Sequence, residues 1–238
     1  MCAVHQPNLF PRLTTLAKLF AADTWIVLDA VQFTRRDYQH RTRLAALDAP
    51  DRVRWLSIPT HLPQGRQTLI QDALIADPTS ARRRTAAMIR HEYRASPHWA
   101  TLQSALEPVW EAFDTGRIAA VAETSTRVLL DLLGWNGSIL TASGLPARPE
   151  RSERLADLTT AAGADTYLCG TGGMTYLDPD PFTARSITVA PFLPPADGIW
   201  ASARRVTALW ALTHLGPAGL AARLRALTRT PDSLEAAA

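Results

Sequence analysis

The chain has 238 residues, of which 47% are hydrophobic and 20% charged, and this balance excludes an intrinsically disordered protein. A formal net charge of +3 permits a phosphorylated or nucleic-acid substrate without requiring one. Two cysteines, Cys2 and Cys169, are too few for a disulfide framework and favour a reducing compartment, so we expect a cytoplasmic protein.

Neither end of the chain nor its interior indicates a membrane protein. The first residues lack the basic segment and apolar run of a signal peptide. The longest apolar runs fall far short of the roughly 20 residues that a membrane helix needs. We therefore expect no membrane partner.

The first third of the chain predicts a strand, a helix and a second strand. Residues 2–6 are apolar and predict a buried strand, and Pro11 is expected to open a helix that runs to about Ala22. Residues 25–28 predict a second strand that ends at Asp29. Together they have the size of a parallel βαβ unit. A third strand is expected at 53–59, and 68–75 is expected to be extended.

The rest of the chain predicts helices first and then further alternation of strands and helices. Residues 79–133 carry apolar side chains at spacings of three and four, and the helices are expected at 81–93, 99–113 and 118–133. Strands are then expected at 138–140, 166–169 and 186–190, and helices at 152–162, capped by Ser152, and 203–215, with Gly163 and Gly216 as their stops.

This order predicts an α/β fold with a mainly parallel sheet, flanking helices and a helical insertion. We expect one domain over residues 1–230 and a disordered tail over residues 231–238.

A first polar cluster follows the first predicted strand, where ligands bind in open parallel sheets. His5 is a candidate catalytic acid or base because its ordinary pKa lies near neutrality, and the alternative is a structural histidine that caps the strand end. Gln6 and Asn8 are candidate substrate-binding residues because their amides both donate and accept. Asn8 has the alternative of capping the helix that follows.

A second polar cluster follows the second predicted strand. Asp29 is a candidate catalytic base or orienting group, with a salt bridge to Arg35 or Arg36 as the alternative. Gln32 is a candidate substrate-binding residue. Arg35, Arg36 and Arg41 are candidates for holding phosphate or carboxylate, since a guanidinium binds these groups through two bonds. The alternative is a solvated surface, because 24 of the 25 basic residues are arginine and Lys18 is the single lysine.

A third cluster follows the late strand that ends at Cys169. Glycines allow close backbone approach, and successive N–H groups there are expected to cradle an anion. The segment matches neither the dinucleotide-binding nor the P-loop pattern, and the cysteine and histidine spacing predicts no metal site. The motifs identify no cofactor. The candidate substrate-binding residues of this cluster are Gly170, Thr171, Gly172, Gly173 and Tyr176.

Two of these segments resemble the paired N-terminal signature of the WbqC-like family. They are His-Gln-Pro-Asn-Leu-Phe-Pro at 5–11 and Asp-Ala-Val-Gln-Phe at 29–33. Supporting motifs at 55–59, 167–170 and 176–178 follow in the family's order, so the resemblance reaches from His5 to about Pro217. Members of this bacterial and archaeal family occur in gene sets for surface polysaccharides and specialised metabolites, which implies a biosynthetic role.

The chain also departs from the family pattern. Arg12 stands where the family often has tryptophan, and Cys169 stands where serine is usual. Near the C-terminus, Thr207, Trp210 and His214 stand where the family tends to have serine, aspartate and asparagine.

The clusters and the resemblance together predict a biosynthetic transferase that acts on a small polar metabolite. Acyl or aminoacyl transfer would form an amide or an ester, and the donor would be an aminoacyl-tRNA or a nucleotide-activated acid. Two alternatives remain open: a nucleotidyltransferase or ATP-dependent ligase, and a non-catalytic binding or scaffold protein.

Overall fold

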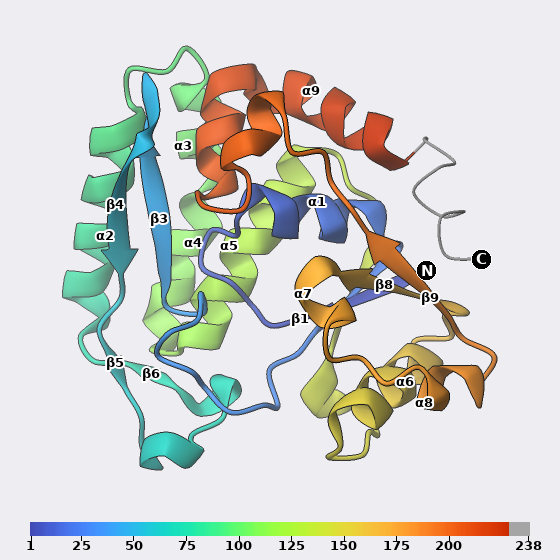
Figure 1. The fold of residues 1–238 in the computed structure, drawn as a ribbon. Coiled ribbons are helices and arrows are strands. Elements are labelled where there is room, and N and C mark those ends of the chain that lie inside the picture. Colours follow the sequence, from blue (N-terminus) through green and yellow to red (C-terminus); the bar gives the residue numbers. More distant parts are fainter. Residues whose placement is uncertain (229–238) are drawn as a thin grey trace.

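The computed structural model describes residues 1–228, and its centre is a five-stranded sheet in which all neighbouring strands are parallel (Figure 1). The strand order is β7-β2-β1-β8-β9. This confirms the α/β fold with a mainly parallel sheet. The tail expected at 231–238 lies outside the described residues. The strands are β1 (Cys2–His5), β2 (Thr24–Val27), β7 (Ser138–Thr141), β8 (Thr166–Gly170) and β9 (Thr188–Phe192).

Both faces of the sheet are covered by helices. Successive side chains along a strand point to opposite faces, and because successive residues here are apolar, both faces need covering. Ala3 and Trp25 belong to a large core that includes side chains of α1 (Leu13–Ala21) and α9 (Ala208–Thr228). Val4 and Ile26, each one position along, belong to a second core with side chains of α6 (Arg151–Ala161) and α8 (Asp180–Thr183). Figure 1 shows α1 and α9 on one side and α6 and α8 on the other.

A hairpin beside α2 is the main departure from the expected strands. The strand expected at 53–59 is the later part of β4 (Ala49–Ser57), which pairs antiparallel with β3 (Arg41–Ala46) and not with the central sheet. The apolar pattern does not predict β3, because arginine and threonine occupy several of its alternating buried and half-buried positions. A second short pair joins β5 (Thr60–His61) to β6 (Leu74–Ile75).

The expected helical segment is present but divided further. The helix expected at 99–113 breaks at Leu106, since Pro108 stands in the first turn of the next helix, where its missing N–H costs nothing. Asp77 caps the first helix by accepting a hydrogen bond from the Ser80 N–H. The four helices are α2 (Pro78–Tyr93), α3 (Trp99–Ala105), α4 (Glu107–Ala112) and α5 (Ile118–Leu132).

Several helix ends differ from expectation. Helix α1 begins two residues after Pro11, and Ser152 does not cap α6, since its hydroxyl accepts from the Asp178 N–H instead. Gly216 does not end α9 but breaks it, with a left-handed φ of 71°. A Cβ at this position would lie 2.6 Å from the ring of His98. The remaining helices are short: η1 (Gly65–Gln67), η2 (Ile70–Asp72), η3 (Phe113–Thr115), η4 (Ala142–Gly144), α7 (Thr171–Met174) and η5 (Gly198–Ser202).

Within residues 1–228, none of the helices combines the length and the apolar character that crossing a membrane requires.

Candidate functional site

A cavity of about 980 Å³ opens where the chain reverses its direction of travel across the sheet. From β1 the chain adds strands on one side, β2 and then β7, and later adds β8 and β9 on the other side. Open α/β sheets bind ligands at this switch point, beyond the carboxyl ends of the strands. His5 ends β1 and Gly170 ends β8, and both line the cavity. Its size suits a small molecule.

The structure brings together most, but not all, of the residues that the sequence selected. Side chains or backbone from all three polar clusters reach the cavity wall. Those that line it are His5, Gln6, Asn8, Gln32, Gly170, Thr171, Gly172, Gly173 and Tyr176. Those that do not are Asp29, Arg35, Arg36 and Arg41.

His5 presents a neutral imidazole to the cavity. Its Nδ1 lies 2.7 Å from the carbonyl oxygen of Gln6, and because a carbonyl only accepts, Nδ1 must carry the proton. Nε2 has no hydrogen-bond partner among residues 1–228 and remains an acceptor. Burial, followed by the positive charge of Lys18, lowers the pKa of His5 to about 3. The ring is therefore uncharged at neutral pH.

Gln6 and Asn8 stand beside His5 in the turn that follows β1. The side-chain oxygen of Gln6 accepts a hydrogen bond of 2.6 Å from the amide of Gln39. Asn8 is buried, and its main-chain carbonyl accepts from the hydroxyls of Ser125 and Thr126 on α5. Asn8 does not cap α1, whose N-cap position is four residues later. Hydrogen bonds to the Asn8 main-chain carbonyl therefore hold the turn, and they do not occupy the side-chain amide of Asn8, which lines the cavity.

Asp29 supports the cavity wall from behind. Its carboxylate accepts hydrogen bonds from the N–H and the hydroxyl of Ser143, at 3.0 and 2.8 Å. No ion pair involves Asp29 within the described part of the chain, so the alternative salt bridge to Arg35 or Arg36 is not formed. Asp29 instead fixes η4, the turn after β7, against the end of β2. Its neighbours Leu28 and Ala30 line the cavity.

The arginines of the second cluster lie on the hairpin side of the molecule. Arg35 donates to the hydroxyl of Thr60 at 3.2 Å. Arg41 donates to the backbone carbonyls of Asp37 and Arg36, and its guanidinium stacks over the ring of Trp55 at 4.5 Å. The structure therefore does not place these three arginines where they can hold a ligand of the cavity.

Five other cationic residues line the cavity, and the sequence analysis selected none of them. Arg12 is the N-cap residue of α1 and Lys18 lies in its last turn, whereas Arg151 and Arg154 belong to the start of α6. Among residues 1–228, none of the five is ion-paired with a carboxylate, and Asp37 is the single acidic residue of the lining. The five are Arg12, Lys18, Arg151, Arg154 and Arg204.

Lys18 is the most deeply buried of these cations, with 6% of its surface exposed. Its Nζ donates to the carbonyl oxygen of Val4 at 3.3 Å. Its stem passes Gly170, where a Cβ would lie 3.7 Å from its Cδ. Burial lowers its pKa to about 8. A signal in the sequence was available, because Lys18 is the single lysine and falls in an apolar turn of its helix.

The glycine segment forms the opposite wall. A Cβ at Gly173 would lie 2.6 Å from the sulfur of Cys169, so this position has no room for a side chain. Burial raises the pKa of the Cys169 thiol, which therefore stays protonated. Helix α7 has only four residues, so the expected anion cradle at Thr171 to Gly173 stays a prediction. Tyr176, 64% exposed at the rim, stacks with the guanidinium of Arg151 at 5.0 Å.

The departures near the C-terminus lie away from the cavity wall. Thr207 is buried and joins the backbone of Arg43, and Trp210 stacks on His214 with 5.4 Å between ring centroids. None of these residues lines the cavity, in contrast to Arg12. In residues 1–228, no group of three or more His, Cys, Asp or Glu side chains is arranged to hold a metal ion.

Comparisons with known proteins agree with the motifs at both strand ends. Residues 6–196 match the WbqC-like protein family. The chain is 23% identical over 190 residues to the uncharacterised protein Rv1507c of Mycobacterium tuberculosis (strain ATCC 25618 / H37Rv), a match that covers 80% of each chain. No solved structure matches the chain significantly. Since the matched range includes most of the chain and both N-terminal motifs except His5, the protein belongs to the WbqC-like protein family.

Proposed function

We propose that the protein is a biosynthetic transferase that moves an acyl or aminoacyl group onto a small polar metabolite. The observation that carries this proposal is the composition of the cavity wall. Four arginines and one lysine, none of them ion-paired with a carboxylate among residues 1–228, line the same cavity as a neutral histidine at the switch point of the sheet. Such a wall favours a donor that carries an anionic leaving group, bound beside a group that can accept a proton.

In the proposed reaction, a nitrogen or oxygen atom of the acceptor attacks the carbonyl carbon of the donor. The attacking atom loses its proton to Nε2 of His5, whose pKa the bound anionic donor raises. The bond between the carbonyl carbon and the leaving oxygen breaks, and His5 passes the proton to that oxygen. The cations stabilise the charge on the carbonyl oxygen and on the departing anion. The product is an amide or an ester. Asp29 acts as a positioning residue in this scheme, through Ser143.

The donor classes that fit are a nucleotide-activated acid and an aminoacyl-tRNA. A cavity of about 980 Å³ holds the reacting end of either donor together with a small acceptor. Gln6, Asn8 and Gln32 supply amide groups for a polar acceptor. Tyr176 and Arg151 offer a stacking surface at the rim for the part of the donor that stays outside.

The test is a transfer assay that uses the purified full chain. A panel of small amines and alcohols is combined with acyl-adenylates or with aminoacyl-tRNAs, and mass spectrometry detects the amide or ester. We expect a product with one donor class and a loss of about 100-fold or more in its rate in His5→Gln. Full activity in a folded His5→Gln chain would show that His5 does not take the proton.

Nucleotidyl transfer or ATP-dependent ligation is a second candidate, because doubly wound sheets bind nucleotides at this same crevice. The two candidates differ in the bond that breaks. A nucleotidyltransferase or ligase would release pyrophosphate from ATP, whereas the proposed transferase would leave ATP intact. Binding of a metabolite without any product from either donor would instead favour the non-catalytic alternative.

A further inference from the structure

The chain uses arginine at 24 of its 25 basic positions, and the exception lies inside the cavity. Arginine stays charged at every relevant pH, whereas burial can remove the charge of a lysine. Lys18 is also the one buried cation of the cavity wall, since Arg12 and Arg154 are partly exposed and Arg151 and Arg204 are exposed. A residue type that appears once, at this position, suggests a role that arginine does not fill.

The ammonium group of Lys18 is incompletely satisfied. It has three N–H donors, and one of them is used by the carbonyl of Val4. Within residues 1–228, no carboxylate forms an ion pair with it. A buried charge without a counter-ion destabilises a folded protein unless a ligand supplies the missing charge.

The ionisable groups around Lys18 do not supply that charge. Cys2 on β1 and Cys169 on β8 could supply negative charge only as thiolates, and burial raises the pKa of both thiols, which keeps them protonated. His5 is uncharged, and Arg12, six residues earlier in the chain, is positive. Among residues 1–228 no group supplies a negative charge at this place, which leaves that role to a bound molecule.

We propose that Lys18 binds a phosphate or diphosphate group of the donor at the end of β1, as the innermost cation of a phosphate site in the cavity. The cavity wall contains five cationic residues and a single acidic residue, Asp37. A ligand with one carboxylate would not balance this excess of positive charge. A phosphate offers about two charges and three acceptor oxygens. This inference rests on the proposed function for its donor and assigns the place in the cavity where a phosphate group of that donor binds.

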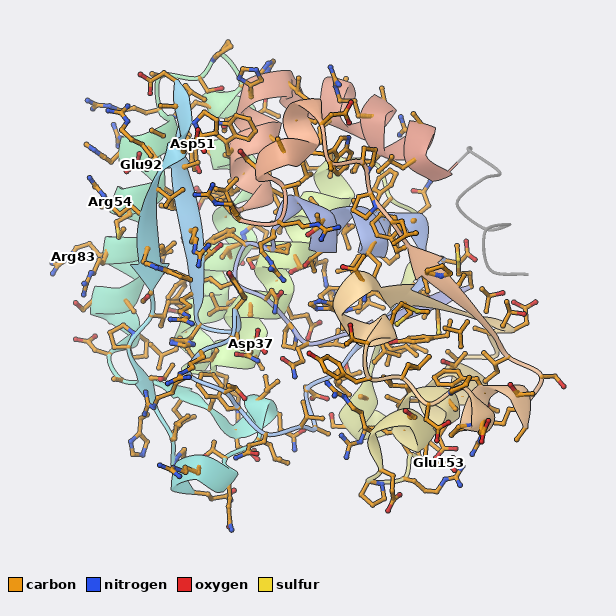
Figure 2. The ribbon with its side chains drawn as sticks, in the orientation of Figure 1. Asp37, Asp51, Arg54, Arg83, Glu92 and Glu153 are labelled. Carbon is orange, nitrogen blue, oxygen red and sulfur yellow. The ribbon has the colours of Figure 1, made fainter. Side chains whose placement is uncertain are left out.

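The site can be tested without any turnover, by calorimetry with inorganic phosphate. Lys18→Met keeps most of the side-chain volume and removes the charge, and we expect it to weaken phosphate binding about 10- to 100-fold near pH 7.5. Arg83→Gln is the matched control, because Arg83 lies on α2 and points away from the rest of the molecule (Figure 2). This control should change the affinity less than about twofold.

The pH dependence separates a binding role from a structural one. Free Lys18 loses its proton near pH 8, and a bound dianion raises its pKa, so phosphate binding takes up a proton above that pH. Wild-type affinity should therefore fall up to about tenfold per pH unit from about pH 8 upward. Lys18→Arg, which keeps its charge, should show no such fall.

Three results would overturn the inference. They are unchanged phosphate affinity in Lys18→Met, the same alkaline loss of affinity in Lys18→Arg, and tighter binding of malonate than of phosphate. If Lys18→Met does not fold, the Lys18→Arg titration decides. If Lys18→Met loses phosphate affinity but the wild-type chain forms no transfer product with any donor, the phosphate site is supported and the proposed function is wrong.

Discussion

The cavity and the β3–β4 hairpin are both rich in arginine, and the two regions differ in what their arginines contact. On the hairpin, Arg41 and Arg43 both stack on the ring of Trp55, with 4.5 and 4.7 Å to the ring centroid. Arg54 reaches across to Glu92 on α2 at 3.5 Å, and both side chains are visible in Figure 2. In the cavity, the arginines meet no carboxylate in the described part of the chain.

Helix α6 shows the same contrast within one element. Arg148, just before the helix, and Arg185 share the carboxylates of Glu153 and Asp157, in ion pairs of 2.7 to 2.9 Å. Arg151 and Arg154, which line the cavity from the same helix, have no such pair. The density of arginine along the chain is therefore a poor guide to this site. Missing counter-charge alone does not identify it either, because Arg41 and Arg43 also have no carboxylate partner among residues 1–228.

The largest expected effect tests this contrast directly. Arg151→Gln together with Arg154→Gln should weaken phosphate binding by about 10- to 100-fold, because each lost charge-assisted hydrogen bond contributes roughly 1 kcal/mol or more. The hairpin pair Arg41→Gln with Arg43→Gln should change the affinity less than about twofold. Calorimetry on both double variants measures the difference, and equal losses would refute the assignment of the site to the cavity.

A smaller effect concerns the pH dependence of stability and one neutral histidine from each region, the partly buried His5 at the cavity and the buried His40 near the hairpin. The pKa of His5 is lowered from 6.5 to about 3 in the folded chain. Between these two pH values the unfolded chain therefore binds a proton at His5, whereas the folded chain does not. Acidification from about pH 7.5 to pH 5 should thus lower the free energy of unfolding of the wild type by about 1 to 2 kcal/mol. His5→Gln should not show this loss.

Urea denaturation at both pH values measures this difference. His40, near the hairpin, has a pKa lowered to about 4 by burial, and Arg41 and Arg35 add to the effect. Replacement of His40 should also reduce the fall in the free energy of unfolding on acidification. Added phosphate should change the acid response through His5 alone, since only His5 lines the cavity. An equal response at His40 would contradict the difference between the regions.

The smallest effect separates residues that line the cavity from those that support it. Ser143→Ala removes one hydrogen bond to Asp29 and should lower the free energy of unfolding by about 1 kcal/mol, while phosphate affinity stays within about twofold. Asp29→Asn should have a similar, mild effect on both quantities and on transfer rate. A loss of about 100-fold in rate for Asp29→Asn alone would show that Asp29 is catalytic.

The sequence by itself determined the fold class and the strand ends at which ligands are expected. Residues 2–4, 25–27 and 167–169 are apolar and are buried as expected, and glycine and proline mark where the chain turns. Parallel strands place their carboxyl ends at one edge, so the sequence predicts that His5 and Gly170 meet there. The family motifs followed from the same residues.

Only the tertiary structure decided which polar side chains face the cavity. Asp29 follows its strand as closely as His5 does, yet it turns to Ser143, more than a hundred residues away in the chain. Arg151 and Arg154 come from a helix that precedes β8, so local spacing does not connect them to His5. Counter-charge and burial depend on long-range packing, so the sequence alone does not show that Lys18 is buried at the cavity with no carboxylate partner among residues 1–228.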